Sequence, residues 1–442
     1  MPLSVEYRAT RSFDFPSEPA PASRAHAIRR ELGLPTDRPI VMSGHQSEFW
    51  HPGILAKWFA AARLAERAGA APVWLEVDQD SNTPWRVHYP AAGPARAAFS
   101  FLSGPEPPVD TPTGLLPPLR PRDPASADPS PGFDFARDGL RAMHRALAAH
   151  EDVPTLAAQL AAARDDLLTP FGPLPRTVFA TALARTVLFA EAVDAMRRDP
   201  PACVEAFNRA AAAHPRARVR ALAMTTARVE LPLWRVQAGR PREPVFSDEL
   251  GGIPQAELAP RALLMTAVVR AGACDLFIHG LGGEMYDLVT EDWMRGWLGW
   301  TLAPTAVVSA TLHLPFDTGD VPRPEEVAAA TWTAHRARHD PGMLGDATGD
   351  ARKRELVAAI DAAESRPERA ALFRDLHAVT AGARAIYAAE LAELDRRAAE
   401  LRVRGVRADV IFDRTWAFPL YPREFLANLR DRVGTSVDDG PR

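Results

Sequence analysis

The sequence has little of what would identify several classes of protein. Only two cysteines, Cys203 and Cys274, occur among 442 residues, too few for a disulfide framework or a thiolate metal site. No uncharged apolar run is long enough to span a bilayer, and the N-terminal residues lack the apolar core of a signal peptide. A net charge of -4 offers no basic surplus for nucleic acid. We therefore expect a cytoplasmic protein with neither a membrane nor a nucleic-acid partner.

The length and composition are those of an ordinary soluble protein. Hydrophobic residues make up 47% of the chain and charged residues 24%, so a sizeable core can be buried. A chain of 442 residues accommodates two or more domains, or one large α/β core with insertions. Because the net charge of -4 gives no basic footprint for nucleic acid, small-molecule substrates are the partners that we expect.

Residues 39–80 have the pattern of a βαβ unit, around which the rest of the chain is organised. The apolar run Ile40–Met42 has the length of a strand and leads into a polar turn. Apolar residues then recur at helical spacing from Ile54 until Gly69 offers a stop, and the run Val73–Val77 completes the unit. In open α/β sheets ligands bind at the carboxyl ends of the strands. The polar residues after each run should therefore face one crevice.

The candidate residues at these two strand ends are Gly44, His45, Gln46, His51, Asp78 and Asp80. His45, Gln46 and His51 are expected to donate to phosphate or carboxylate oxygens at the helix N-terminus, where free backbone N–H groups also favour an anion. Asp78 and Asp80 are expected to orient an ammonium group, act as a base or hold a divalent cation. The alternative interpretation is structural, with histidines that cap helices and with one aspartate as an N-cap and the other solvated.

A second strand-to-turn segment repeats this layout. The run Leu276–Ile278 ends in His279 and a glycine-rich stretch that permits close backbone approach to a phosphate or sugar. Candidate substrate contacts there are Gly282, Gly283, Glu284 and Tyr286, with His279 as an acid–base group. The stretch matches neither the dinucleotide-binding glycine pattern nor a Walker loop. The alternative is that His279 is a half-buried structural histidine.

The whole pattern predicts an α/β fold: a Rossmann-like open sheet with helices on both faces, plus a C-terminal antiparallel helical hairpin. We expect the core at 1–320, with a proline-rich and helical insertion at about 84–170. The hairpin, a helical or coiled-coil element, is expected at 321–405, and a segment that returns to the core at 406–442.

Smaller features carry further expectations. The insertion should hold one short strand at Ala97–Leu102. The run Glu230–Val236 should be an edge strand because it contains a proline, and Asp409–Phe412 should be a strand. Arg414 and Trp416 lie in an aromatic and basic loop that is suited to an anionic ligand with stacking, although surface arginines are common.

Five short segments share motifs with one known enzyme family. They are Gly44–Gly53, Ala71–Asp80, Gly280–Tyr286, Ser309–Leu312 and Phe412–Trp416. The first three segments match, in order, the family's G-Q-Q-x-G-L-x-T-G-P turn, its V-P-V-x-W strand ending in E-D-H-D, and its G-G-P-G-E-x-x-Y stretch. The last two match the strand before the family's coiled coil and its Q-E-R loop. On these motifs the chain resembles the cysteine-adding enzymes of bacillithiol biosynthesis (BshC, the cysteine ligases).

The resemblance implies a Rossmann-like core related to nucleotidyltransferases and a coiled-coil insertion that mediates homodimers. It also implies chemistry that joins cysteine to an amino-sugar malate conjugate through an amide. The chain departs from the family at His45, where the family has glutamine, and at Glu48 and His51, where the family is small or apolar. Val77 and Gln79 break the family's acidic-histidine run. These departures concern the cysteine substrate more than the fold.

Three hypotheses follow. The first is a ligase that condenses an amine with an activated carboxylate, with ATP or ADP as the nucleotide. In it the histidines stabilise phosphate or oxyanion charge, the aspartates hold an ammonium group, and Glu284, Tyr286 and Arg414 orient the second substrate. The second is a metal-assisted hydrolase or transferase that uses the histidines and aspartates as ligands. The suitable ligand types lack the compact spacing of a known zinc motif, and they are His45, His51, Asp78, Asp80 and His279. The third is a non-catalytic dimeric scaffold.

Overall fold

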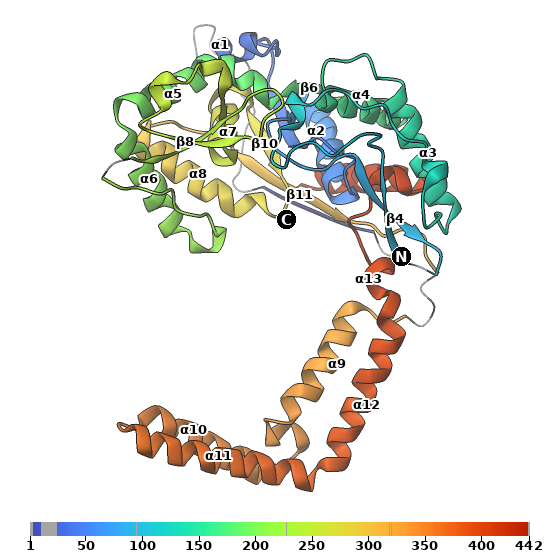
Figure 1. Cartoon of the computed structure of the whole chain (residues 1–442), viewed down its shortest axis with the longest axis vertical. Coiled ribbons are helices and arrows are strands. Elements are labelled where there is room, and N and C mark those ends of the chain that lie inside the picture. Colours follow the sequence, from blue (N-terminus) through green and yellow to red (C-terminus); the bar gives the residue numbers. More distant parts are fainter. Residues whose placement is uncertain are drawn as a thin grey trace. The chain divides into compact units, whose positions relative to one another are not determined.

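The computed structural model describes residues 3–9, 24–93, 95–226, 228–317, 319 and 321–440, with the backbone alone for Ala9 and Glu284. The chain divides into two compact units (Figure 1). The first comprises Met1–Pro315 with Arg414–Arg442, and the second comprises Phe316–Asp413. Within the described residues, none of the helices combines the length and the apolar character needed to cross a bilayer.

The first unit is built on a six-stranded sheet with the strand order β1-β11-β10-β2-β3-β6. Its strands are β1 (Ser4–Ala9), β2 (Ile40–Gln46), β3 (Ala71–Val77), β6 (Arg176–Phe179), β10 (Leu276–His279) and β11 (Thr305–Thr311). All neighbours pair in parallel except β1, which runs antiparallel along the edge of β11. The predicted α/β class with an open, mostly parallel sheet is therefore confirmed.

Helices cover both faces of this sheet, as predicted. The helices α2 (Pro52–Ala68) and α14 (Arg423–Asp438) pack together on one face. The helices of the other face are α1 (Arg24–Glu31), α5 (Val187–Arg198), α6 (Pro200–Ala213), α7 (Ala262–Val268) and α8 (Gly283–Trp297). Alternate strand residues such as Met42 and Phe277 join this second set in one buried apolar cluster.

The predicted βαβ unit is present, with a longer first strand than expected. His51 caps α2, Pro52 occupies its first turn, and Gly69 ends it in the left-handed conformation with φ 61°. The strand β2 continues to Gln46, so His45 and Gln46 lie in the strand itself rather than in the turn after it. Side-chain alternation therefore decides which way each of them points.

The insertion contains a β-hairpin and two helices: β4 (Arg86–Ala91), β5 (Ala95–Ser100), α3 (Asp134–Ala148) and α4 (Leu156–Leu168). The sequence predicts one short strand here, which corresponds to β5, and misses β4. Pro90 lies inside β4. Because both strands of a two-stranded sheet are edge strands, a proline is tolerated there.

A second sheet has the order β8-β7-β9, with β7 (Glu230–Arg235) in the centre between β8 (Glu243–Phe246) and β9 (Leu258–Pro260). The prediction of an edge strand at Glu230–Val236 is therefore wrong. Pro232 lies where the register between β7 and β8 shifts, so its missing N–H removes no regular ladder bond.

The predicted strand at Asp409–Phe412 is also wrong, because this segment forms the short helix α13 (Ala408–Ile411). A four-residue apolar run does not by itself distinguish a buried strand from a buried helical turn. Here the run follows helical residues directly, and Phe412 N–H donates to the Ala408 carbonyl in helical register.

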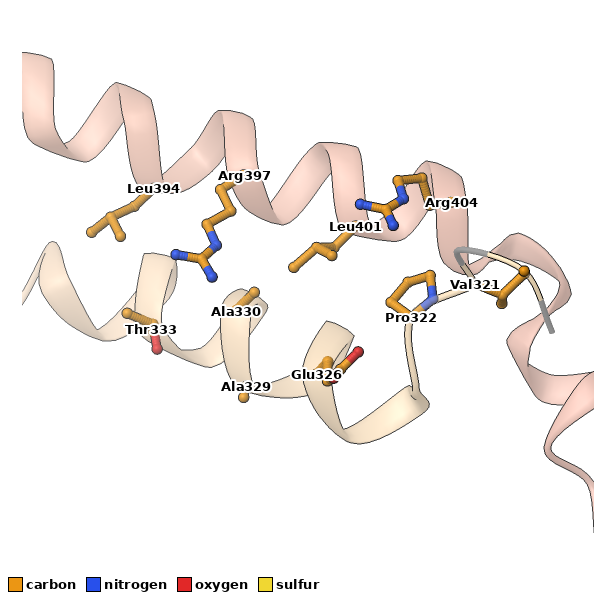
Figure 2. Close-up of a pocket in the computed structure, with 11 residues that line it drawn as sticks. Val321, Pro322, Glu326, Ala329, Ala330, Thr333, Leu394, Arg397, Leu401 and Arg404 are labelled. Atoms are coloured by element: carbon orange, nitrogen blue, oxygen red, sulfur yellow. The ribbon is translucent and has the colours of Figure 1, made fainter. Parts of the chain in front are cut away.

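The second unit is helical. Its helices are α9 (Pro324–Ala337), α10 (Ala347–Ala362), α11 (Arg366–Ile386) and α12 (Ala388–Arg404), and α9 packs along α12 while α10 packs along α11 (Figure 1). C-terminal helices are thus confirmed, while the coiled coil and the homodimer stay predictions. A groove of about 640 Å³ lies between α9 and α12, with Arg397 and Leu401 on one side and Ala330 on the other (Figure 2). It contains none of the candidate residues.

A buried ion pair ties the insertion to the main sheet. Glu76 of β3 and Arg164 of α4 are both fully buried, and Arg164 Nη1 donates to Glu76 Oε1 at 2.9 Å. The Arg164 guanidinium also lies 3.9 Å from the centroid of the Trp50 ring. Burying such a pair costs desolvation free energy, but removing one partner costs more because the other charge is left buried and unpaired.

We predict that Arg164→Met lowers the free energy of unfolding by about 3–5 kcal/mol, because it leaves the Glu76 carboxylate buried and unpaired. The measurement is urea denaturation at neutral pH. The double variant Arg164→Met with Glu76→Gln should recover most of the loss, since the stranded charge is gone.

The matched control is Arg63→Met, which removes an arginine that pairs with Asp438 on the surface. It should change stability little, because exposed pairs are screened by water. A loss in Arg164→Met no larger than in this control would show that the buried pair does not hold the insertion in place.

Candidate active site at the sheet switch point

The order of the main sheet reverses between β2 and β10. The chain proceeds from β2 to β3 and β6 on one side, whereas β10 leads to β11 on the other. The connecting helices α2 and α8 lie on opposite faces. In such sheets the connections diverge at the reversal and leave a crevice at the carboxyl ends of the two strands. His45, Gln46 and His279 lie at these strand ends.

His51 closes the first turn of α2. Its Nδ1 accepts the Gly53 N–H at 3.1 Å, and its carbonyl accepts the Ile54 N–H at 2.9 Å. The free N–H groups expected at this helix N-terminus are therefore already bonded. Because Nδ1 is an acceptor, the neutral ring carries its proton on Nε2, which is left to donate. Burial, with Arg414 and Lys57 nearby, lowers the pKa of His51 to about 4, so the ring is neutral at pH 7.

Lys57, which is absent from the predicted site, lies in the middle of α2 and is buried. Its Nζ donates to the Gly44 carbonyl at 2.6 Å and lies 5.6 Å from the centroid of the Trp74 ring. Burial lowers the pKa of this ammonium to about 7. A buried lysine without a carboxylate partner is unusual, because desolvation of the charge costs several kcal/mol.

The sequence did contain a signal for Lys57. The chain has only two lysines, Lys57 and Lys353, among 52 basic residues, and Lys57 interrupts an apolar run of α2. A charged residue on the buried face of a helix is rare unless the site requires it. In a chain that otherwise uses arginine, this lysine stands out.

His45 extends the cluster of basic groups. Its pKa is well below the ordinary histidine value because of burial first, and then because of Lys57, His51 and Arg164. Its Nδ1 lies 3.5 Å from Glu48 Oε1 and makes no hydrogen bond. Lys57, His51 and Arg164 thus help burial to keep His45 uncharged, and an anion among these groups would favour its charged form.

Arg414 belongs to the same neighbourhood. Its Nη1 donates to Thr311 Oγ1 at 3.3 Å at the end of β11, and its charge helps to lower the pKa of His51. Trp416, the aromatic partner predicted for it, is only 1% exposed and has the Arg96 guanidinium 4.9 Å from its ring centroid. Trp416 therefore packs inside the protein instead of offering an open stacking surface.

The two aspartates are engaged by protein groups. Asp78 Oδ1 accepts the Thr181 N–H at 2.8 Å, and Oδ2 accepts the Thr181 hydroxyl at 2.5 Å. Burial raises the pKa of Asp78 to about 6. Asp80 accepts from Gln46 Nε2 at 3.0 Å and from Arg242 Nη1 at 2.5 Å. These contacts favour structural roles, with Gln46 held through Asp80.

His279 lies on the opposite face of the sheet from His45. Ser43 and Ile278 are partners in register, His45 shares the face of Ser43, and His279 follows Ile278 by one residue. Its Nε2 is 3.0 Å from Asp287 Oδ1 but is not oriented for a hydrogen bond. The structure therefore groups His45 and His51 but places His279 beside α8.

Arg270 Nη1 in turn donates to Asp287 Oδ1 at 3.0 Å. A Cβ at Gly283 would lie 2.5 Å from the His279 ring, so this position requires glycine. The ring is therefore held between β10 and the first turn of α8.

The glycine turn before α8 follows β10 at the same end of the sheet. No side chain caps α8 at Gly282, and the Gly283 N–H donates to the Gly280 carbonyl at 2.9 Å. A Cβ at Gly280 would come 4.0 Å from Lys57 Cδ, so the lysine stem runs beside the turn. Tyr286 is 43% exposed. For Glu284 the structure describes the backbone alone.

Within the part of the chain that the structure describes, no group of three or more histidine, cysteine, aspartate or glutamate side chains is placed to hold a metal ion. The predicted ligand types are dispersed: Asp78 and Asp80 have separate partners, and His279 lies across the sheet.

Comparison with known proteins adds little. No protein-family model matches the chain, and no curated protein matches it. A solved Campylobacter jejuni structure described as "putative arginyl t-RNA synthetase" aligns over 94% of this chain and 97% of its own, with 10% sequence identity and a TM-score of 0.25. A likeness at this level carries no argument about this chain.

We predict that Lys57→Met raises the free energy of unfolding by roughly 2–4 kcal/mol at pH 6, after subtracting about 1 kcal/mol for the lost hydrogen bond. The unfolded lysine titrates near 10.5 and the folded one near 7, so the unfolded chain binds more protons between these values. Wild-type stability therefore rises with pH in this window, and the advantage of the variant should shrink by pH 9.5. Urea denaturation across pH measures this.

Lys353→Met, at the chain's other lysine, is the control and should show no such gain. NMR of protein labelled with ¹³C-lysine contains only two lysine side chains, so the signal missing in Lys57→Met reports the pKa of Lys57 directly. A pKa near 10 for that signal would refute the assignment of a desolvated amine.

Proposed function

We propose that this protein is a ligase-type enzyme that binds a phosphate-bearing ligand, ATP or ADP, at the switch point between β2 and β10. The reaction would join an amino acid, cysteine or a similar one, to an amine-bearing small molecule such as an amino-sugar conjugate. The observation that carries the phosphate site is the buried Lys57 ammonium, which has a backbone carbonyl as its partner and the glycine turn beside it. The amide-forming chemistry rests on the motif resemblance alone.

The donors at the switch point suit phosphate oxygens. Lys57 supplies a compact ammonium, and His51 supplies an Nε2–H of fixed tautomer. The N-terminus of α8 has no side-chain cap and would supply the backbone N–H groups that follow Gly283, whose own N–H is bonded to Gly280. Preorganised donors of this kind stabilise charge that develops during acyl or phosphoryl transfer. When bound, the nucleotide supplies the activation of a carboxylate.

The remaining candidates would serve the second substrate. Arg414 lies beside His51 and could orient a carboxylate, and the partly exposed Tyr286 lies on the first turns of α8. Glu284 retains its proposed role as a contact for an amine or hydroxyl group. Asp80 would act indirectly, by holding Gln46. No observation favours the metal-assisted alternative.

We predict that ADP or ATP binding is accompanied by proton uptake near pH 7.5, because an anion beside Lys57 raises the pKa of its ammonium. Isothermal titration calorimetry in two buffers of different ionisation enthalpy measures both the affinity and the protons taken up. Lys57→Met should weaken binding at least about tenfold, as expected for loss of a charged hydrogen-bond donor. It should also abolish the proton uptake.

Lys353→Met is the matched control and should bind as wild type does. Binding that survives unchanged in Lys57→Met would place the nucleotide elsewhere, and no binding at all would remove the nucleotide from the proposal. Mass spectrometry of reactions with cysteine, an amino sugar conjugate and ATP then tests the condensation itself. A product that requires all three supports the ligase, while binding without any product would favour a non-catalytic protein.

A further inference from the structure

A pocket in the first unit is lined by Asp80, whose carboxylate also accepts a hydrogen bond from Gln46 at the switch point. It has a volume of about 290 Å³ and opens between the end of β3, the three-stranded sheet and the start of α7. The charged side chains in its wall are Asp80, Arg220, Arg242 and Arg261. This volume is at the small end of ligand sites, so it suits a molecule about the size of an amino acid or a short dicarboxylate.

Positive charge is in excess in this pocket. Arg220 Nη2 and Arg261 Nη1 share Glu230 Oε1 at 2.6 Å each, and Arg242 pairs with Asp80. Three guanidinium groups thus meet two carboxylates in the lining and its direct partners. Arg220 and Arg242 both depress the pKa of Arg261, after burial as the main cause, so the three cations are close enough to repel one another.

Two of these arginines are fixed by an aromatic ring. The Arg261 guanidinium lies 4.2 Å from the centroid of the Trp234 ring, and that of Arg242 lies 4.6 Å from it. Stacking of this kind holds the planar fork of an arginine in one orientation. The donors are therefore arranged before any ligand arrives, which lowers the entropic cost of binding.

Two buried polar atoms in the wall lack a partner. Arg261 Nη2 makes no hydrogen bond, although Nε and Nη1 are bonded to the Leu233 carbonyl and to Glu230. Gln79 is 3% exposed and lines the pocket, and its Oε1 is also unpartnered, although its Nε2 donates to the Pro260 carbonyl. Buried donors and acceptors are rarely left open unless water or a ligand satisfies them.

We propose that this pocket binds the oxyanion of a small molecule, a carboxylate or a phosphate, on Arg242 and Arg261. Arg261 Nη2 donates to the anion, and Gln79 Oε1 accepts from a hydroxyl or amine on the same ligand. Apolar residues of α6 and α7, including Phe207 and Leu263, contact its carbon skeleton. This site does not depend on the function proposed for the switch point.

The pocket is nevertheless linked to the switch point by hydrogen bonds. Gln46 at the end of β2 donates to Asp80 Oδ2, and Asp80 Oδ1 accepts from Arg242. An anion that draws Arg242 toward itself must weaken that pair or share it. A ligand in the pocket would thereby change the hydrogen bond between Asp80 and Gln46.

Calorimetric titration at fixed ionic strength with succinate, inorganic phosphate and the uncharged succinamide tests the site. Succinate, phosphate or both should bind to the full-length protein, and succinamide should not. Arg242→Met should weaken the binding at least about tenfold. Should that variant fail to fold, Arg220→Met, whose side chain is 69% exposed, should weaken it measurably with the fold intact.

Arg235→Met is the matched control, since Arg235 follows Trp234 on β7, pairs with Glu257 and does not line the pocket. It should bind as wild type does, and so should Lys57→Met, which separates this site from the nucleotide site. Binding of succinate alone assigns a carboxylate, and binding of phosphate alone assigns a phosphate. Failure of both to bind, or an equal loss in Arg235→Met, would overturn the proposal.

Discussion

The buried Glu76 carboxylate is the constraint on which this end of the molecule depends. It lies in β3, between β2 and the edge strand β6, on the face of the sheet that α2 covers. It is fully removed from water, where an unpaired charge is untenable. Arg164 meets it from α4, in the long insertion, and stacks on Trp50, whose backbone directly precedes the cap of α2. One ion pair therefore fixes the insertion, the sheet and the N-terminus of α2 relative to one another.

The same arrangement explains why Lys57 can exist where it does. Trp50, Trp58 and Trp74 pack on one another with ring centroids 4.3–5.5 Å apart, and they form a rigid aromatic wall. Lys57 lies over Trp74 within this wall, where a cation gains from the ring but gains no carboxylate. Folding alone would favour an apolar residue there. A site that keeps an amine at a cost in stability is better understood as prepared for a charge that arrives with a ligand.

The sequence predicted the βαβ unit because periodicity, the proline at the first turn and the glycine stop of α2 all agree. It failed where one local signal competes with tertiary context. Pro232 indicated an edge strand, but it lies in the central strand β7 at a shift of register, where its missing N–H is tolerated. The apolar residues of α13 indicated a strand but form a helical turn. At the site, the strand-end rule located His45 and His279 but not the faces on which they lie. Lys57 stood out in the composition, but its contact with the Gly44 carbonyl could not be inferred from spacing. The bonds between Asp78 and Thr181 could not be inferred either, because they join segments that are far apart in the sequence.

The position of Asp80 suggests why two ligand sites would lie on one strand end. Asp78 is fixed by Thr181, whereas Asp80 Oδ2 accepts from Gln46 and Asp80 Oδ1 accepts from Arg242 and the Ser81 N–H. A carboxylate shared in this way cannot strengthen one contact without weakening the other. Two substrates that must react in sequence need such a connection if the second is to be held only when the first is in place. The chain Gln46–Asp80–Arg242 has the geometry for this coupling, because each link is a single hydrogen bond that a bound anion can redirect.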